Sequence, residues 1–269
     1  MSVNSVNMVR QWVSAVLCVV GGALMPGLLS GCAIPMPSAS AGVSEIQVRL
    51  VHVAPNAPRI DLEVGGVRAA QGVAYGSVSE YVRMPAGEYD IVLFSTPETT
   101  SPGQPASFKD SVPLARTVAA RTVANLRGGG VFSVVAADEP NRVTALVLED
   151  NINSLFDQAL VRFVHAAPDA PALQWQGEQG RVLIPQLAFG QVSTFQAMRP
   201  GFTQIQVAIA PSAPAPGGQS SPGRSIPLQR FDLQLEAGKV YTLYVAGLMR
   251  SNPGLNLVLA EETRARRLL

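Results

Sequence analysis

The sequence is poor in charge, histidine, cysteine and aromatic residues, and these shortages exclude several classes of function. Charged residues make up 14% of the 269 residues, against about 25% in an ordinary soluble domain. A net charge of +1 excludes a polybasic nucleic-acid-binding protein and an acidic tail protein. Aromatic residues, at 6%, are too few for an extended aromatic binding surface. By contrast, 24 Gly and 21 Pro predict a chain with many turns.

The N-terminus carries an apolar run without charge from Trp12 to Leu29. Its length would let it span a membrane, so an uncleaved anchor helix is one interpretation. The run ends in Leu29-Ser30-Gly31-Cys32, which resembles the lipobox of bacterial lipoproteins. That resemblance implies cleavage before Cys32 and acylation of its thiol and its new amine, for example with palmitate.

Removal of residues 1–31 leaves 238 residues with no net charge. Cys18 leaves with the signal peptide and Cys32 carries lipid, so neither a free thiol nor a disulfide is expected. Residues 33–44 read AIPMPSASAGVS, without charge or apolar period, and predict a flexible tether. Ala33, where an Asp would signal inner-membrane retention in enterobacterial lipoproteins, favours the outer membrane.

The rest of the sequence consists of two copies of one repeat. Val48–Pro58 reads VRLVHVAPNAP and Val161–Pro171 reads VRFVHAAPDAP, with eight of eleven positions identical at a shift of 113. Val73–Tyr81, VAYGSVSEY, returns as Leu187–Phe195, LAFGQVSTF. A period this long is a domain rather than a solenoid repeat.

Each copy predicts about seven β-strands, because apolar residues alternate over short runs bounded by Gly, Pro and Asn. We expect an all-β protein of two tandem immunoglobulin-like or transthyretin-like β-sandwiches. The predicted segments are the signal peptide 1–31, tether 32–44, first sandwich 45–150, linker 151–159, second sandwich 160–262 and basic tail 263–269. That tail, with Arg264, Arg266 and Arg267, is either solvated or in contact with anionic lipid.

Both copies place a Pro/Ser/Gly-rich loop after the same strand, Ser95–Ser107 in the first and Pro211–Ser225 in the second. Such loops are either binding loops or mobile connections.

The two histidines occupy the same position of each copy, directly before a proline-rich turn. A catalytic zinc site takes three protein ligands, and neither copy offers a thiol or an HExxH spacing. We therefore predict a structural motif in which each histidine binds the backbone of the following turn and Asn56 or Asp169 forms an Asx-turn. The residues of this motif are His52, Pro55, Pro58, His165, Pro168, Asp169 and Pro171.

Other chemistry has few candidates. No GxSxG or phosphate-binding glycine loop occurs. Asp61 and Glu63 share one strand face, where solvated side chains are expected, and the second copy has Gln174 and Gln176 instead. Calcium binding at 149–153 lacks the alternating oxygen ligands of a calcium loop. Trp175 stands at the position of Leu62, which predicts a core residue rather than a sugar platform.

The motif VHxAPxAP, followed by Ala-(Tyr/Phe)-Gly-x-Val-Ser, resembles the bacterial family of domains of unknown function numbered 4397. The resemblance covers about residues 45–150 and 160–262 and implies tandem β-sandwiches on secreted or lipid-anchored proteins. It implies no activity and no site residues. The Asp after the prolines is Asp61 in the first copy but Gln174 in the second.

These observations predict a non-enzymatic envelope lipoprotein without cofactor or catalytic residues. Its partners would be the membrane, through the lipid on Cys32, and an envelope protein or polymer, but not nucleic acid. Duplicated domains with equivalent loops suit avidity. The alternatives are a hydrolase that uses carboxylates on envelope polymers and a sugar-binding protein.

Overall fold

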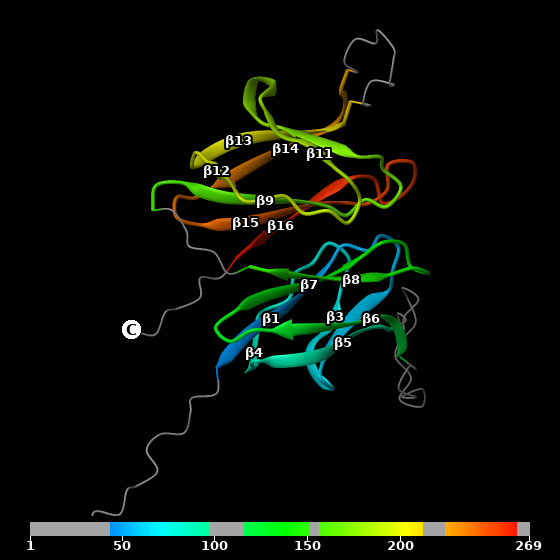
Figure 1. The fold of residues 1–269 in the computed structure, drawn as a ribbon. Helices are drawn as coiled ribbons and strands as arrows, with labels where there is room; N and C mark the ends of the chain where they lie inside the picture. Colours follow the sequence, from blue (N-terminus) through cyan, green and yellow to red (C-terminus); the bar gives the residue numbers. More distant parts are fainter. Residues whose placement is uncertain (1–43, 97–115, 151–155, 212–223, 263–269) are drawn as a thin grey trace, which may run out of the picture. The chain divides into compact units, whose positions relative to one another are not determined.

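The computed structural model describes residues 44–96, 116–150, 156–211 and 224–262 (Figure 1). The signal peptide, Cys32, the tether up to residue 43 and the basic tail lie outside these residues, as do 97–107 and 212–223 of the two predicted loops. Within the described ranges, no helix has the length and apolar character needed to cross a membrane.

The described residues form sixteen strands, eight in each copy of the repeat. The first eight are β1 (Glu45–His52), β2 (Arg59–Val64), β3 (Val67–Val73), β4 (Val82–Pro85), β5 (Gly87–Thr96), β6 (Thr117–Leu126), β7 (Val131–Ala137) and β8 (Thr144–Glu149). The next eight are β9 (Ala159–His165), β10 (Leu173–Gln176), β11 (Val182–Leu187), β12 (Gln196–Met198), β13 (Gly201–Ile209), β14 (Ile226–Leu235), β15 (Val240–Ala246) and β16 (Asn256–Glu261). A 3-10 turn, η1 (Glu178–Gly180), connects β10 to β11.

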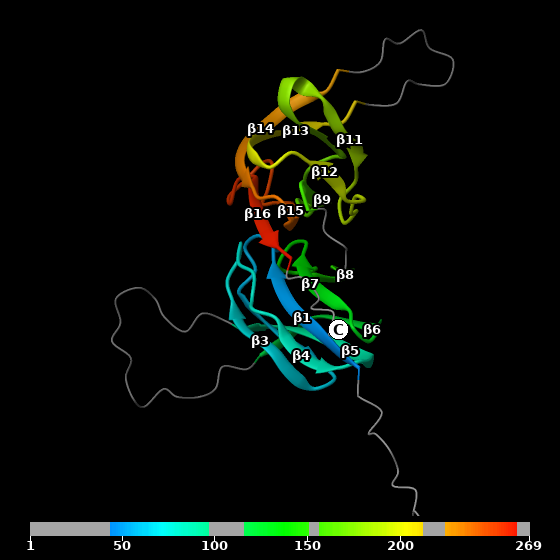
Figure 2. The ribbon, with the colours of Figure 1, turned by 90° about the vertical axis from the view of Figure 1, so that its left-hand side faces the viewer.

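The strands pair into four sheets whose order repeats from the first copy to the second. The first copy has the sheets β4-β1-β7-β8 and β3-β2-β5-β6, and the second has β12-β9-β15-β16 and β11-β10-β13-β14. β1 pairs in parallel with β7, and β9 with β15, whereas the other pairs are antiparallel (Figure 2). The expected all-β sandwich class is therefore confirmed, with eight strands in each copy rather than about seven.

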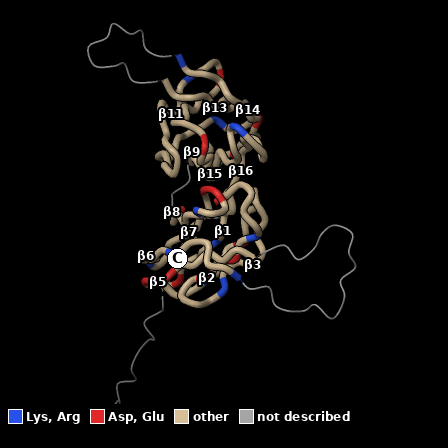
Figure 3. Tube along the Cα trace, turned by 90° about the vertical axis from the view of Figure 1, so that its right-hand side faces the viewer, with Lys and Arg blue, Asp and Glu red and all other residues tan. Residues whose placement is uncertain are grey.

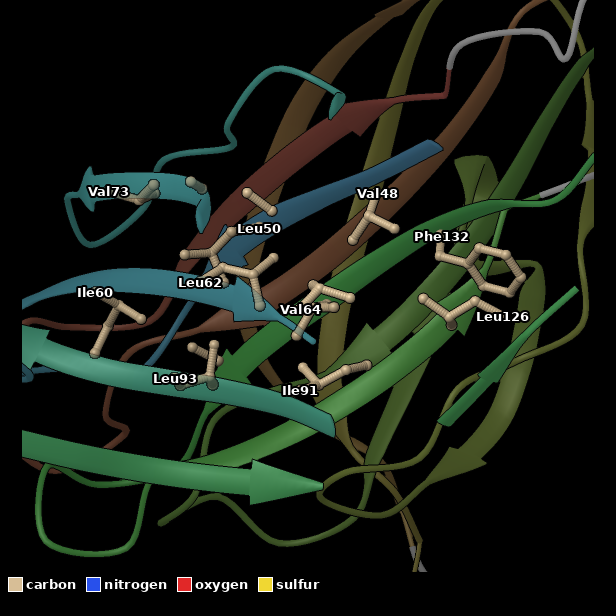
Figure 4. Close-up of a cluster of buried hydrophobic side chains, with 14 of the residues drawn as sticks. Val48, Leu50, Ile60, Leu62, Val64, Val73, Ile91, Leu93, Leu126 and Phe132 are labelled. Atoms are coloured by element: carbon tan, nitrogen blue, oxygen red, sulfur yellow. The ribbon is translucent and has the colours of Figure 1, made fainter. Parts of the chain in front are cut away.

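Alternation along the strands fills a core between the two sheets of each sandwich. In β1, Ile46, Val48 and Leu50 are at most 1% exposed and belong to one core cluster with Leu62 of β2. Figure 4 shows Leu50 beside Leu62 in this core. In the second sandwich, Trp175 is fully buried, with its ring centroid 4.6 Å from that of Phe163. Trp175 is thus a core residue, as predicted.

The opposite face of β1 is also buried, although a sandwich exposes its outer faces by default. Val51 and Val135 of the first sandwich share an apolar cluster with Val164 and Tyr244 of the second. The described residues belong to one compact unit, and this cluster lies within it. Charged residues are scattered sparsely along the trace (Figure 3).

Candidate functional site

The repeated motif closes a loop around each histidine. His52, the last residue of β1, is fully buried, and its Nε2 lies 3.0 Å from the carbonyl oxygen of Pro58. The backbone N–H of Ala54 donates to Nδ1 at 3.3 Å. Since Nδ1 accepts, the ring is the neutral tautomer with its proton on Nε2, which donates to Pro58.

The second copy has the same geometry. His165 Nε2 lies 3.0 Å from the Pro171 carbonyl oxygen, and the Ala167 N–H donates to Nδ1 at 3.3 Å. Burial lowers the pKa of both histidines, and the hydrogen bonds to the proline carbonyls oppose this only in part. Both rings therefore hold backbone groups of the following turn.

The second half of the motif packs against the first. The Gly76 N–H donates to the His52 carbonyl at 2.8 Å, and the Tyr75 ring meets the His52 imidazole edge-to-face at 6.1 Å. Phe189 meets His165 in the same way, also at 6.1 Å. Gly76 has φ +77°, a conformation that glycine adopts without strain. The two halves of the motif thus form one structural unit in each sandwich.

Asp169 and Asn56 have partners other than those expected. Asp169 accepts from the backbone N–H groups of Met249 and Arg250, at 2.6 and 3.0 Å. Asn56 donates to the Asn252 carbonyl at 2.9 Å. Both side chains hold the loop between β15 and β16, so the Asx-turn expectation is replaced by long-range contacts.

The prolines of the motif divide by role. Pro58 and Pro171 supply the carbonyls that bind the histidines. Pro55 is buried and Pro168 is half-buried.

A buried cluster of charged side chains, which we call the interface cluster, joins the sandwiches. It begins at Arg49 on β1, whose side chain is 4% exposed. Its guanidinium donates to Glu262 and to the Glu261 carbonyl, both at the end of β16 in the other sandwich. Within its own sandwich it donates to Ser133 Oγ at 2.8 Å and lies 4.4 Å from the ring centre of Tyr81.

Arg162 on β9 makes the reciprocal contacts. Its guanidinium donates to Asp150 Oδ1 at 2.6 Å and to the Glu149 carbonyl at 2.9 Å, both at the end of β8. It also donates to Thr242 Oγ1 at 2.8 Å and lies 4.8 Å from the ring centre of Phe195. Each arginine therefore binds the last strand of the other sandwich.

The interface cluster has two guanidinium and two carboxylate groups in contact. Tyr81 joins the carboxylates by donating to Glu262 at 2.9 Å and to Asp150 at 3.2 Å. Burial, and then the negative charge of Asp150, raise the pKa of Glu262 to about 7, against the opposing effect of the arginines. Burial also raises the pKa of Tyr81, which keeps its hydroxyl protonated.

Contrary to expectation, the carboxylate pair of the first sandwich is not solvated. Asp61 is 2% exposed; its Oδ1 accepts from the Gly72 N–H at 2.7 Å, and its Oδ2 accepts from Arg116 at 3.3 Å. Arg116 also donates to Glu63 at 2.7 Å and lies 4.4 Å from the ring centre of Phe94.

The second sandwich replaces this charged group with neutral side chains. Gln176 donates to Gln174 at 2.6 Å and to Ser225 at 3.2 Å. The two carboxylates thus have no duplicated counterpart. Among the described residues, no group of three or more His, Cys, Asp or Glu is placed to hold a metal ion. Asp150, considered for calcium, binds Arg162 and Ser133 instead, and residues 151–153 lie outside the described ranges.

Sequence reasoning missed the interface cluster. Its signal was the pair Arg49 and Arg162, which occupy identical positions of the repeat between apolar neighbours, Val48 and Leu50 in the first copy and Val161 and Phe163 in the second. An arginine opposite the core-facing residues of a strand normally faces solvent, so alternation alone gave no sign of a second buried face.

One family matches in sequence. Residues 46–176 match the family described as Domain of unknown function (DUF4397), which confirms the predicted resemblance over the first sandwich and strands β9 and β10. No curated protein matches the chain.

Three solved structures are similar at a low level. The Bacillus anthracis TIE protein is 10% identical with a TM-score of 0.21; the match covers 76% of this chain and 33% of that one, so the chain spans a third of its length. A candidate cell adhesion protein from Bacteroides uniformis is 11% identical, with 83% and 98% coverage and a TM-score of 0.20. Another from Bacteroides ovatus is 12% identical, with 82% and 96% coverage and a TM-score of 0.19. TM-scores this low carry no argument for this chain.

Proposed function

We propose that this protein, whose residues 46–176 match DUF4397, is a lipid-anchored, non-catalytic binding or structural module of the bacterial cell envelope. The lipid is on Cys32, and residues 33–44 connect it to the two sandwiches. Ala33 favours the outer membrane.

The interface cluster is the observation that carries this proposal. Arg49 and Arg162 are nearly fully buried, and each binds a carboxylate of the other sandwich. Breaking a buried ion pair by removing one partner typically costs about 3–5 kcal/mol. Such contacts hold the two sandwiches as one body, which suits a module that spaces or presents a partner at the end of a tether.

The candidate catalytic groups support the same proposal. Both nitrogens of each histidine are occupied by backbone groups. Asp61 and Glu63 share one partner, because the Arg116 guanidinium lies 3.3 Å from Asp61 Oδ2 and 2.7 Å from Glu63 Oε1. The histidines and the two carboxylates therefore already have partners within the fold.

The anchor is tested by labelling and fractionation. We expect the wild-type chain to incorporate labelled palmitate and to enter the membrane fraction, and Cys32→Ser to do neither. An unlabelled, soluble wild-type protein would reject the lipoprotein proposal.

The non-catalytic role is tested on isolated envelope polymers. We expect the purified full chain to release no more soluble fragments than the heat-denatured chain. Release that is lost in Asp61→Asn or Glu63→Gln would establish the hydrolase alternative instead.

A further inference from the structure

An open pocket of about 790 Å³ lies at one end of the second sandwich. Its walls come from the η1 turn, from Leu183 on β11, from Met198 on β12 and from Phe202 at the start of β13. Volumes of this order are typical of ligand pockets.

The first sandwich fills the same place with a tyrosine. Tyr89 stands two residues after Gly87, as Thr203 stands two residues after Gly201. The Tyr89 ring lies so close to Gly65 that a Cβ there would be 2.6 Å from Cδ1, and the Tyr89 hydroxyl donates to the Pro85 carbonyl at 2.8 Å. The smaller Thr203 leaves this space open in the second sandwich, where the β10–β11 turn also contains η1.

The pocket carries unpaired positive charge beside an exposed aromatic ring. Arg181 and Arg199 line it, and among the described residues neither guanidinium has a hydrogen-bond or ion-pair partner. Glu178 is the only acidic residue in the described lining, so the net charge of the lining is positive. The Phe202 side chain is 87% exposed. Aromatic residues and arginine are enriched at protein interfaces, and arginine binds carboxylates well.

Two sheet edges border the pocket. β11 and β12 are each the terminal strand of their sheet (Figure 2). Both strands contribute lining residues to the pocket. An edge strand offers backbone N–H and C=O groups to an extended peptide, which binds as an added strand. This favours a peptide over a glycan or a lipid headgroup.

We propose that the pocket binds an extended acidic segment of a partner protein. One large apolar side chain of the segment enters the pocket against Leu183, Met198 and Phe202, and its carboxylates pair with Arg181 and Arg199. The segment runs along the edge of β11 or β12. This inference rests on the proposed binding function and gives its partner a chemical class.

The test is a selection from a library of random twelve-residue peptides against the full chain purified in detergent. We expect the selected peptides to be enriched in Asp and Glu around a large apolar residue. Their affinity is then measured by fluorescence anisotropy. Thr203→Tyr, which copies the first sandwich, should weaken binding at least tenfold.

Further variants separate loss of the site from loss of the fold. Phe202→Glu copies Glu88 of the first sandwich at an exposed position and should also weaken binding at least tenfold through repulsion. Arg181→Gln and Arg199→Gln should each weaken it three- to tenfold and reduce its salt dependence. Arg230→Gln, on β14 at the opposite edge of the same sheet, is the matched control and should change nothing.

Three results would overturn the inference: no acidic enrichment, affinity unchanged in both Thr203→Tyr and Phe202→Glu, or variant-sensitive binding only of anionic vesicles or acidic glycans. If the pocket binds no such peptide, palmitate labelling and membrane fractionation should still give the expected results. If the proposed function is wrong, those two assays should fail. The two failures are therefore distinguishable.

Discussion

The paired histidines show how one side chain can replace a backbone partner. Proline has no N–H, and the turn after His52 contains Pro55 and Pro58, so the imidazole supplies hydrogen bonds that the turn cannot make for itself. We expect His52→Ala to lower the free energy of unfolding by about 1–3 kcal/mol, because the Ala54 N–H and the Pro58 carbonyl lose their partner.

Urea unfolding followed by circular dichroism measures this loss, and His165→Ala should behave alike because its contacts are the same. The loss should be independent of added metal. A melting temperature raised by zinc or copper in the wild type but not in these variants would contradict the structural role.

The lowered pKa of both histidines predicts a pH dependence of stability. Their contribution is present above the unfolded pKa of about 6.5 and is lost as the pH falls toward the lower folded pKa. The free energy of unfolding should therefore decrease on acidification below about pH 6.5, by at most ~1.4 kcal/mol per pH unit for each histidine. The difference between wild type and His165→Gln, measured from pH 7.5 to 5, isolates the effect. A difference that does not vary with pH would refute it.

Glu262 predicts a dependence of the opposite sign. Its pKa of about 7 lies above the ordinary glutamate value of 4.5, so its contribution is fully present below about pH 4.5 and is lost as the pH rises through 7. The groups that face it are Asp150, Arg49, Arg162, Thr242 and Tyr81. In Glu262→Gln, the decline in stability between pH 4.5 and 7 should be reduced, as measured by urea unfolding at each pH. An unchanged decline would show that Glu262 stays ionised.

At the scale of the elements, most strands could be predicted, and the shortest could not. β1 and β13 carry clear alternation, whereas β12 has three residues and β4 has four, too few for a period to show. The sequence therefore indicated about seven strands where eight form. The pocket also escaped prediction, because the absence of a ring at Thr203 has meaning only once Tyr89 is seen to fill the same space.

Two glycines with positive φ should differ sharply in the stability lost on substitution by alanine. One of them, Gly247, lies in the loop between β15 and β16. Gly247 has φ +90°, and a Cβ there would lie 2.2 Å from the carbonyl oxygen of Gly254. Gly190 has φ +75° but nothing within 4 Å of an added Cβ. Gly190→Ala should lower the free energy of unfolding by about 1–2 kcal/mol from the left-handed conformation alone. Gly247→Ala should lose clearly more, because backbone must move as well. Thermal melting of both variants checks this order, and equal losses would contradict it.

At the scale of the whole molecule, the interface cluster predicts that the two sandwiches recognise each other without a covalent link. Residues 32–155 and 156–269, expressed separately, should form a one-to-one complex, measured by analytical ultracentrifugation. Arg49→Glu in the first fragment should abolish the complex, because Arg49 binds Glu262 across the interface. Arg121→Glu is the control, since Arg121 is exposed and pairs with Asp90 in its own sandwich.

The same experiment tests whether each sandwich folds alone, which is a prediction from the repeat. Circular dichroism of each fragment should show a β spectrum and a cooperative melt. Folded fragments that stay apart would reject mutual recognition, whereas a fragment that melts without cooperativity would reject independent folding.

The reciprocity of Arg49 and Arg162 also bears on how such a chain arises. Each arginine meets the end of the last strand of the other copy, so a chain with only one copy could make both contacts by pairing with itself across a two-fold axis. Fusing two such genes turns a homodimer into a monomer while its contacts are kept. After fusion the two halves can also differ in sequence, so that one keeps Tyr89 while the other has no ring at that position and has an open cavity. A symmetric dimer would have to change at both ends together.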